Sequence, residues 1–180
     1  AFSKVLLTRG SADKLSAQYV RWETDTENYA ARGNVDAISE SRILKAGEAG
    51  RNGNKFWGKN VTRYEDRVKK VGFSAASVEG TFRGKLMAEV VASGSVSIDY
   101  VDKAGLKTVV TGDKAIYSKD RGTVVISGNA SAVRSDGKVV TADNLVLHEE
   151  SKNIEAIGRS KITFDMPKND KKANSEAKGN

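Results

Sequence analysis

The feature that most constrains the fold is a repeat in the C-terminal half of the chain. Segments that begin at Val110 and Val140 align when one is shifted by 30 residues, as VTGDKAIYSKDRGTVVISGNASA and VTADNLVLHEESKNIEAIGRSKI. Each opens with Val-Thr, a small residue and Asp, and each carries a glycine at the same place, Gly128 and Gly158. Self-similarity at a fixed spacing is typical of stacked copies of one supersecondary unit.

A third copy, LSAQYVRWETDTENYAARGNVDA, begins at Leu15 and has Gly33 at the equivalent position. In all three copies apolar or small residues alternate with polar ones, and a polar turn segment separates two alternating runs. Alternation with a period of two is typical of a β-strand with one buried face. The sequence therefore predicts an all-β chain of antiparallel strand-turn-strand repeats with one apolar face, with the three glycines at bulges or bends.

The rest of the chain follows this pattern unevenly. The run from Val90 to Ile98 matches the second strand of a copy, whereas Val5–Leu7 is either a first edge strand or a frayed arm. Residues 47–75 interrupt the repeat with glycines and asparagines, which predicts loops or bulges, and a charged run at 63–70 fits a polar strand or a short helix. Phe56-Trp57 within this segment fits core packing better than a ligand-binding role.

Composition favours a thin body and anionic partners. Hydrophobic residues make up 38% of the chain and aromatic residues 7%, and the net charge of +7 is spread over the whole length. A diffuse basic surface favours phosphate-bearing lipid, a membrane surface or nucleic acid. We expect one domain over residues 1–166, followed by a disordered polar tail over 167–180.

The sequence carries no recognisable catalytic or metal site, so we expect a protein that is not an enzyme and uses no cofactor. His148 is the only histidine and stands at a polar repeat position, and there is no cysteine to complete a zinc site. Asp113 and Asp143 recur at one repeat position, where a turn or bulge role is a better interpretation than a carboxylate pair. The aromatic residues fall at apolar positions, which argues against stacking with nucleic acid.

The two C-terminal copies, together with the fair match at residues 15–46, resemble the OstA/LptA-like family of periplasmic lipopolysaccharide-transport proteins. The resemblance is good over 88–164 and absent over 47–75. It implies an OstA-like β-jellyroll, a V-shaped stack of antiparallel strands around an interior hydrophobic groove. In that family the groove shields the acyl chains of lipopolysaccharide while the sugars stay in solvent.

The resemblance also implies a periplasmic location, end-to-end self-association through open edge strands, and LptC-like and LptD-like transport components as partners. Such a protein bridges the inner-membrane and outer-membrane machinery. Combined with the repeat positions, the resemblance predicts a groove lined by Trp22, Tyr29, Val110, Ala115, Tyr117, Val124, Ile126, Val140, Leu145, Leu147, Ile154, Ala156, Ile162 and Phe164.

Two alternatives stay open. The chain is either a lipid carrier or a structural β-repeat scaffold whose apolar face is fully self-packed, and small inner residues such as Ala31 and Gly112 favour the carrier because they leave space. Within the transport pathway, an LptC-type or LptD-type domain is the alternative to a free-standing bridge, and the lack of an N-terminal anchor in the sequence favours the bridge.

Overall fold

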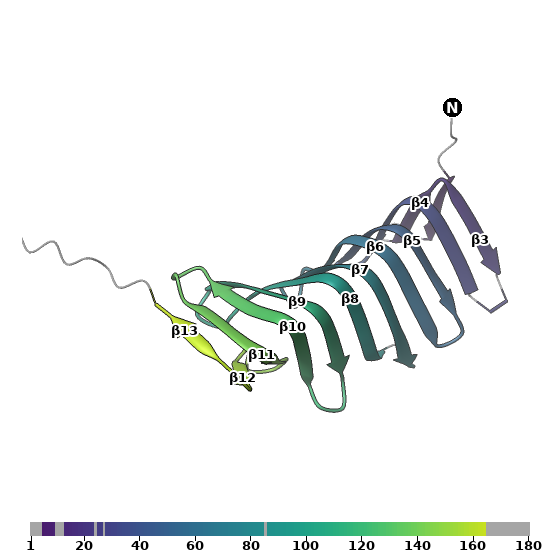
Figure 1. The fold of residues 1–180 in the computed structure, drawn as a ribbon. Helices are drawn as coiled ribbons and strands as arrows, with labels where there is room; N and C mark the ends of the chain where they lie inside the picture. The colour runs from purple at the N-terminus through teal and green to yellow at the C-terminus, as the bar shows by residue number, and fades with distance from the viewer. Residues whose placement is uncertain (1–4, 10–12, 24, 27, 85, 165–180) are drawn as a thin grey trace, which may run out of the picture.

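The chain forms one long antiparallel sheet that is bent along its length (Figure 1). The computed structural model describes residues 5–9, 13–23, 25–26, 28–84 and 86–164, and the predicted tail over 167–180 lies outside them. The described residues form strands and turns, and none of them is helical. The strands are β1 (Val5–Arg9), β2 (Asp13–Ala17), β3 (Tyr19–Glu23), β4 (Asn28–Ser39), β5 (Arg42–Asn52), β6 (Lys55–Asp66), β7 (Val71–Arg83), β8 (Leu86–Val101), β9 (Lys107–Ser118), β10 (Thr123–Arg134), β11 (Val139–His148), β12 (Ile154–Ile157) and β13 (Lys161–Thr163).

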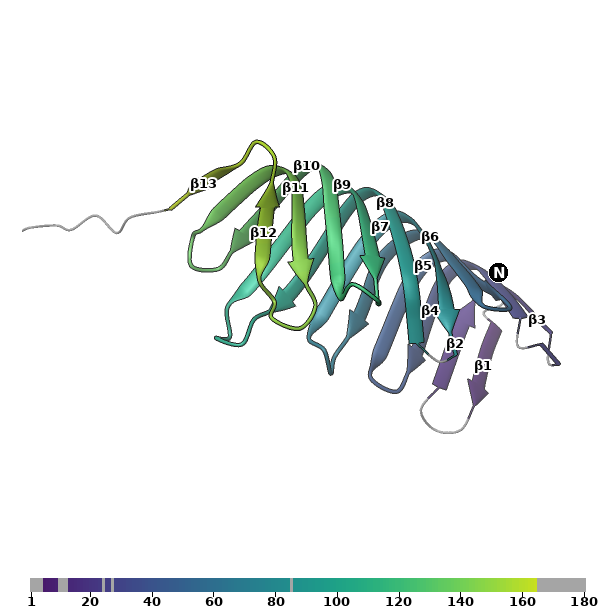
Figure 2. The ribbon, with the colours of Figure 1, turned by 90° about the horizontal axis from the view of Figure 1, so that it is seen from below.

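Strands β4 to β11 pair in sequence order, each antiparallel to the next. At both ends of the stack, two short strands lie on one long strand. β2 and β3 both pair with β4, and β12 and β13 both pair with β11, with β1 added outside β2. Figure 2 shows the same stack from below, with β1 and β2 at one end and β12 and β13 at the other. Each end therefore presents short edge strands.

A line of β-bulges bends the strands near their middles. The register shifts between Arg32 and Val35 in β4, and between Ser127 and Ala130 in β10. Two of the three predicted bend glycines, Gly33 and Gly128, lie in these shifts with φ of 76° and 72°, and the third, Gly158, lies between β12 and β13 with φ of 87°. Because this backbone conformation is costly for residues with a Cβ, glycine is the residue that fits. The bulges divide the sheet into two arms that share one inner face.

The cross-strand registers confirm the predicted repeat alignment. One inner row of paired residues follows the bend along the stack, and we call it the crease row: Val20, Ala31, Ala49, Gly58, Val78, Ala92, Ala115, Ile126, Leu145 and Ala156. Its members are mostly small, and Ala31, Ile126 and Leu145 are fully buried. Small residues at the bend allow the larger side chains of the two arms to approach each other.

Of the loops or bulges predicted over residues 47–75, the loops are wrong and bulges are present, with register shifts between Val61 and Tyr64 in β6 and from Ser74 in β7. This segment contains the second half of β5, all of β6 and the start of β7, which are separated by two turns, at 53–54 and 67–70. Glycine was misleading there because Gly50 lies within a strand, where the Trp57 ring covers its position from the neighbouring strand. The charged run at 63–70 is the end of β6 and the following turn, and Val5–Leu7 belongs to edge strand β1.

Candidate functional site

The inner face carries one apolar row on each side of the crease. The first-arm row consists of Trp22, Tyr29, Arg51, Phe56, Gly80, Val90, Tyr117, Val124, Leu147 and Ile154. The second-arm row consists of Leu7, Leu15, Ala37, Leu44, Tyr64, Phe73, Ile98, Val110, Ala132, Val140 and Ile162. Since directly paired residues point to the same face, each row is a continuous strip along the stack.

The two halves of this inner face differ in exposure. Within β8 to β11, the core residues Ile98, Val110 and Leu147 are 7%, 0% and 4% exposed. Toward the N-terminal half, the large inner side chains of Phe56 and Phe73 are only half-buried and pack at the margin of the core. The inner face of β8 to β11 therefore has more large side chains that are fully buried, whereas Phe56 and Phe73, like Tyr117, Val124 and Val140 in the C-terminal half, keep part of their apolar surface accessible to solvent.

Two contacts join the free ends of the two arms over the inner face of the C-terminal half. We call the gap between these ends the mouth. The Lys69 Nζ in the β6–β7 turn donates to Glu149 Oε1 in the β11–β12 turn at 2.7 Å. Beside it, the Tyr100 hydroxyl at the end of β8 donates to the Lys152 carbonyl at 3.3 Å. The β6–β7 turn and the end of β8 belong to the second arm, and the β11–β12 turn belongs to the first. We call these two contacts the mouth latch.

Backbone hydrogen bonds position both sides of the mouth latch. The buried Asp66 Oδ1 accepts hydrogen bonds from the backbone N–H groups of Val68 and Lys69 at 3.1 and 3.0 Å, which holds the β6–β7 turn. On the first arm, the Glu149 N–H donates to the Gly122 carbonyl at 2.7 Å and joins two neighbouring turns. The side chains of the mouth latch therefore project from fixed backbone.

Glu149 is the electrostatic centre of this region. Its Oε2 accepts hydrogen bonds from the Tyr117 hydroxyl at 3.0 Å and from Lys119 Nζ at 3.4 Å. Burial opposes the charged form, but the hydrogen bonds from Lys69 and Tyr117 and the charges of Lys69 and Lys119 lower the pKa of Glu149 to about 2. Burial, reinforced by the hydrogen bond to Glu149, raises the pKa of Tyr117. Glu149 is thus a carboxylate at any physiological pH.

The structure places most of the predicted groove residues on the inner face, with different degrees of burial. Fully buried are Val110, Ala115, Ile126, Leu145 and Leu147, and half-buried are Tyr29, Tyr117, Val124, Val140, Ile154 and Ala156. The three exposed ones are Trp22, Ile162 and Phe164, at 41%, 55% and 57%.

The three exposed residues lie at the ends of the stack. Trp22 and Ile162 hold inner positions but lie on the terminal strands β3 and β13, which have no described neighbour on their outer side to cover them. Trp22 stacks on Tyr29 with ring centroids 5.7 Å apart. Phe164 lies beyond the end of β13, with Lys138 Nζ 5.8 Å from its ring centroid.

Sequence reasoning missed the accessible part of the inner face. Phe56, Tyr64 and Phe73 lie on it, in the segment that was predicted to form loops or bulges, and only Phe56 was interpreted there as a core residue. The alternation of Val71, Phe73 and Ala75 was the available signal. The Tyr64 hydroxyl is buried and has no hydrogen-bond partner among the described residues, so the apolar interior contains one unsatisfied polar atom.

The residues with catalytic side-chain types take structural positions. Asp143 accepts a hydrogen bond from the Arg159 N–H at 3.0 Å beside Gly158, and Asp113 accepts one from Asn129 Nδ2 at 3.0 Å beside Gly128. His148 lies at the surface, 3.6 Å from Glu155. In the described parts of the chain, no group of three His, Cys, Asp or Glu side chains is placed to hold a metal ion.

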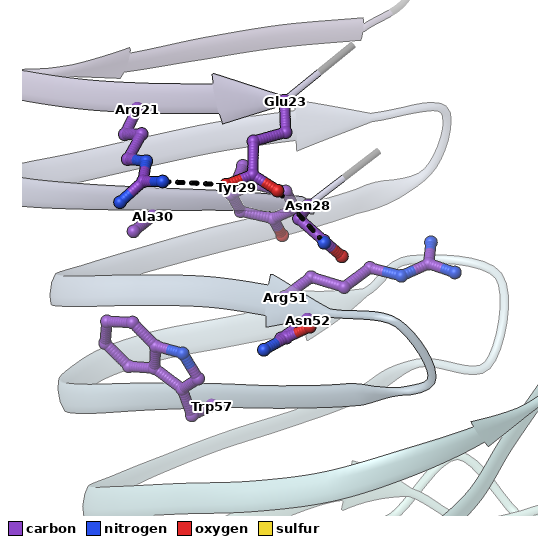
Figure 3. A pocket seen from close by; sticks show the side chains of 8 residues that line it. All are labelled: Arg21, Glu23, Asn28, Tyr29, Ala30, Arg51, Asn52 and Trp57. Carbon is purple, nitrogen blue, oxygen red and sulfur yellow. Dashed lines mark hydrogen bonds and ion pairs between the residues drawn. The ribbon is translucent and has the colours of Figure 1, made fainter. Parts of the chain in front are cut away.

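A small open hollow lies at the N-terminal end of the stack. Its volume is about 210 Å³, and it is lined by Arg21, Glu23, Asn28, Tyr29, Ala30, Arg51, Asn52 and Trp57 (Figure 3). Glu23 within it accepts hydrogen bonds from Arg21 Nη2 at 2.9 Å and Asn28 Nδ2 at 3.3 Å. A volume of this size is below the roughly 300–1,000 Å³ of typical small-molecule sites.

Comparison with solved structures matches this architecture to a known fold. The structure is similar to that of LptH, the LptA homologous periplasmic component of the lipopolysaccharide transport device of Pseudomonas aeruginosa, with a TM-score of 0.50 and 12% sequence identity. The match covers 86% of this chain and 95% of LptH. The chain has the LptA-like fold.

This similarity confirms the predicted all-β, OstA-like architecture. At 12% identity it concerns the fold alone. No protein-family model matches the sequence, and a search of curated protein sequences found no match. No helix of the described residues is long and apolar enough to cross a membrane.

Proposed function

We propose that this protein is a periplasmic lipopolysaccharide carrier that shields acyl chains on its inner apolar face and bridges the membrane assembly machineries. It does so without breaking a bond, so it is not an enzyme. The observation that carries the proposal is the strip of half-buried large apolar side chains, among them Phe56, Phe73 and Val90, along the inner face. Each buried CH₂ of an acyl chain contributes about 0.8 kcal/mol.

Two further features support a lipid ligand. The buried Tyr64 hydroxyl lacks a partner among the described residues, and a polar atom near the carboxyl end of an acyl chain offers one. The described surface also bears many lysines and arginines, in line with the net charge of +7. A positive field attracts the phosphates of lipopolysaccharide.

Val90 and Val91 allow a matched test of this proposal. Val90 lies on the inner face and packs against the core, whereas its neighbour Val91 is 37% exposed on the outer face. We expect Val90→Asp to reduce retention of lipopolysaccharide by the immobilised protein at least tenfold, because the chain would dehydrate the carboxylate. Val91→Asp should retain wild-type binding. Equal binding by both folded variants would overturn the proposal.

The bridging role rests on the edges of the sheet. β1 and β3 at one end, and β12 and β13 at the other, are edge strands with apolar exposed side chains such as Leu6, Tyr19 and Ile157. Unpaired edges pair readily with other strands. We propose that copies of this chain join end to end through them, and that LptC-like and LptD-like components use the same edges.

A structural scaffold without lipid cargo is the second candidate function. The observation that favours it is the tight packing of the C-terminal half, where Val110, Ile126 and Leu145 are all 0% exposed. Mass spectrometry of protein purified under native conditions separates the two. Co-purified acylated glycolipid supports the carrier, and its absence after incubation with lipopolysaccharide supports the scaffold.

A further inference from the structure

A basin lined mainly by basic residues spans the mouth between the two arms, above the inner face of β8 to β11. Its volume is about 940 Å³, several times that of the N-terminal hollow. Lys69 and Lys103 reach it from the β6–β7 and β8–β9 turns of the second arm. On the first arm, the β9–β10 and β11–β12 turns with the end of β11 supply the remaining lining, namely Lys119, Arg121, Gly122, His148, Glu149, Glu150, Ser151 and Lys152.

Positive charge dominates this basin. Its lining contains five Lys or Arg side chains and two Glu side chains, which leaves a formal charge of +3 with His148 neutral. Within the residues that the structure describes, Lys103, Arg121 and Lys152 make no ion pair. Partial burial lowers the pKa of Lys152. The charge of Glu149 raises this pKa, and the charge of Lys69 lowers it. Cations crowded in this way favour a bound anion.

The position of Glu149 shows where an anion fits. One carboxylate receives Lys69 Nζ at 2.7 Å, the Tyr117 hydroxyl at 3.0 Å and Lys119 Nζ at 3.4 Å. Three donors from three different elements therefore converge on one group. A phosphomonoester carries more charge than a carboxylate and has three acceptor oxygens, so it competes well for the same donors.

We propose that the basin is a phosphate-binding site, in which a phosphomonoester replaces the Glu149 carboxylate on Lys69 and Lys119 and so releases the mouth latch. The source of the phosphate is either the headgroup of an acylated glycolipid or free phosphate, and only the first source rests on the proposed function. A headgroup held here lies directly above the closed inner face of β8 to β11. Release of the β11–β12 turn then opens that half to the acyl chains.

The test uses the full chain and three probes: an acylated glucosamine phosphate, the same lipid without its phosphate, and inorganic phosphate. Binding is measured by calorimetry, and the amide NMR signals of residues 149–153 report on the turn. We expect the phosphorylated lipid to bind about tenfold or more tightly than the phosphate-free one, since charge-assisted hydrogen bonds are strong. Signals from 149–153 should shift with the phosphorylated lipid.

The double variant Lys103→Gln/Arg121→Gln removes two basin cations that take no part in the mouth latch, which keeps the fold intact. It should reduce the preference for the phosphorylated lipid, because two of the five basin cations are gone, while binding the phosphate-free lipid as the wild type does. Lys114→Gln, on the outer face, is the control and should keep the preference. Saturable shifts with inorganic phosphate alone, lost in the double variant, support the site with free phosphate as its source.

Equal affinity for both lipids, without shifts from inorganic phosphate, overturns the phosphate site and leaves the carrier function standing. If neither lipid binds, the carrier function fails, and the inorganic-phosphate titration alone decides on the site. A preference for the phosphorylated lipid that is undiminished in the double variant overturns the assignment to this basin.

Discussion

Lys69 Nζ lies 2.7 Å from Glu149 Oε1, although 80 residues separate them in the chain and they project from opposite arms of the sheet. Together with the hydrogen bond from Tyr100 to the Lys152 carbonyl, this pair holds the arms together over β8 to β11. Val110 and Leu147 on the same strands are buried in the hydrophobic core. The mouth latch therefore connects turns and strand ends of the two arms that lie far apart in the sequence.

Glu149→Gln should loosen the β11–β12 turn without unfolding the sheet. The substitution keeps the shape of the side chain but removes the charge that Lys69 and Lys119 contact. We expect amide hydrogen exchange at residues 149–153 to accelerate about five- to thirtyfold, the equivalent of 1–2 kcal/mol. Glu150→Gln in the same turn is the control and should leave the exchange unchanged. Identical hydrogen-exchange protection of residues 149–153 in the two variants would show that the charge of Glu149 does not hold the β11–β12 turn in place.

The stability of the protein should depend on the protonation of Glu149 at acidic pH. Its pKa is lowered from an ordinary value of 4.5 to about 2 in the folded protein. A lowered folded-state pKa stabilises the fold fully above pH 4.5, and this contribution is lost as the pH falls from 4.5 toward 2. We expect the Tm of the wild type to fall more steeply than that of Glu149→Gln across this window. Parallel Tm profiles would contradict the prediction.

Ile126→Ala should destabilise the fold strongly. Ile126 is 0% exposed in the crease row, so its truncation leaves a cavity that costs about 2–5 kcal/mol of unfolding free energy. Ile116→Ala is the matched control on the neighbouring strand, because Ile116 is 41% exposed on the outer face, and its cost should be about 1 kcal/mol or less. Urea unfolding measures both. A similar loss for the two variants would show that the assigned faces are wrong.

Ile162→Lys should weaken end-to-end association. Ile162 is 55% exposed on the terminal strand β13, and lysine on an edge strand disfavours pairing with another chain. Val133→Lys is the control, since Val133 is 48% exposed on β10, which has strands on both sides. Light scattering over a concentration series should show growth for the wild type and for Val133→Lys. A wild type that stays monomeric throughout would remove the basis for assembly through the edges.

The sequence was sufficient to predict the strands and faces wherever a repeat was clear. Period-two alternation placed Ile126 and Leu147 inside, and both are buried, because a shift of one residue would have turned every side chain outward. It failed at residues 47–75, where Gly50 and Gly58 lie within strands rather than in loops. A glycine in such a segment does not distinguish a loop from a strand. It occurs in turns, and it also occurs within strands where an aromatic ring from the neighbouring strand covers it, as Trp57 covers Gly50.

The mouth latch was beyond sequence reasoning for a different reason. Lys69 and Glu149 lie in turns, outside the alternating pattern, and they meet only because the bulges bend the sheet. The exposure of Ile162 likewise depends on its place at the end of the stack rather than on its repeat position. Periodicity predicts which face a side chain occupies, and the tertiary bend decides what covers that face.

Photo-crosslinking at Phe56 and Trp57 tests the central claim most directly. These adjacent aromatic residues of β6 lie on opposite faces, because Phe56 packs against the core and the Trp57 ring lies over Gly50 on the outer face. A photoreactive phenylalanine at each position in turn, irradiated with labelled lipopolysaccharide, reports which face meets the acyl chains. A carrier gives an adduct at position 56 and none at position 57. Equal labelling at both positions, or labelling at position 57 alone, would contradict an inner lipid-binding face.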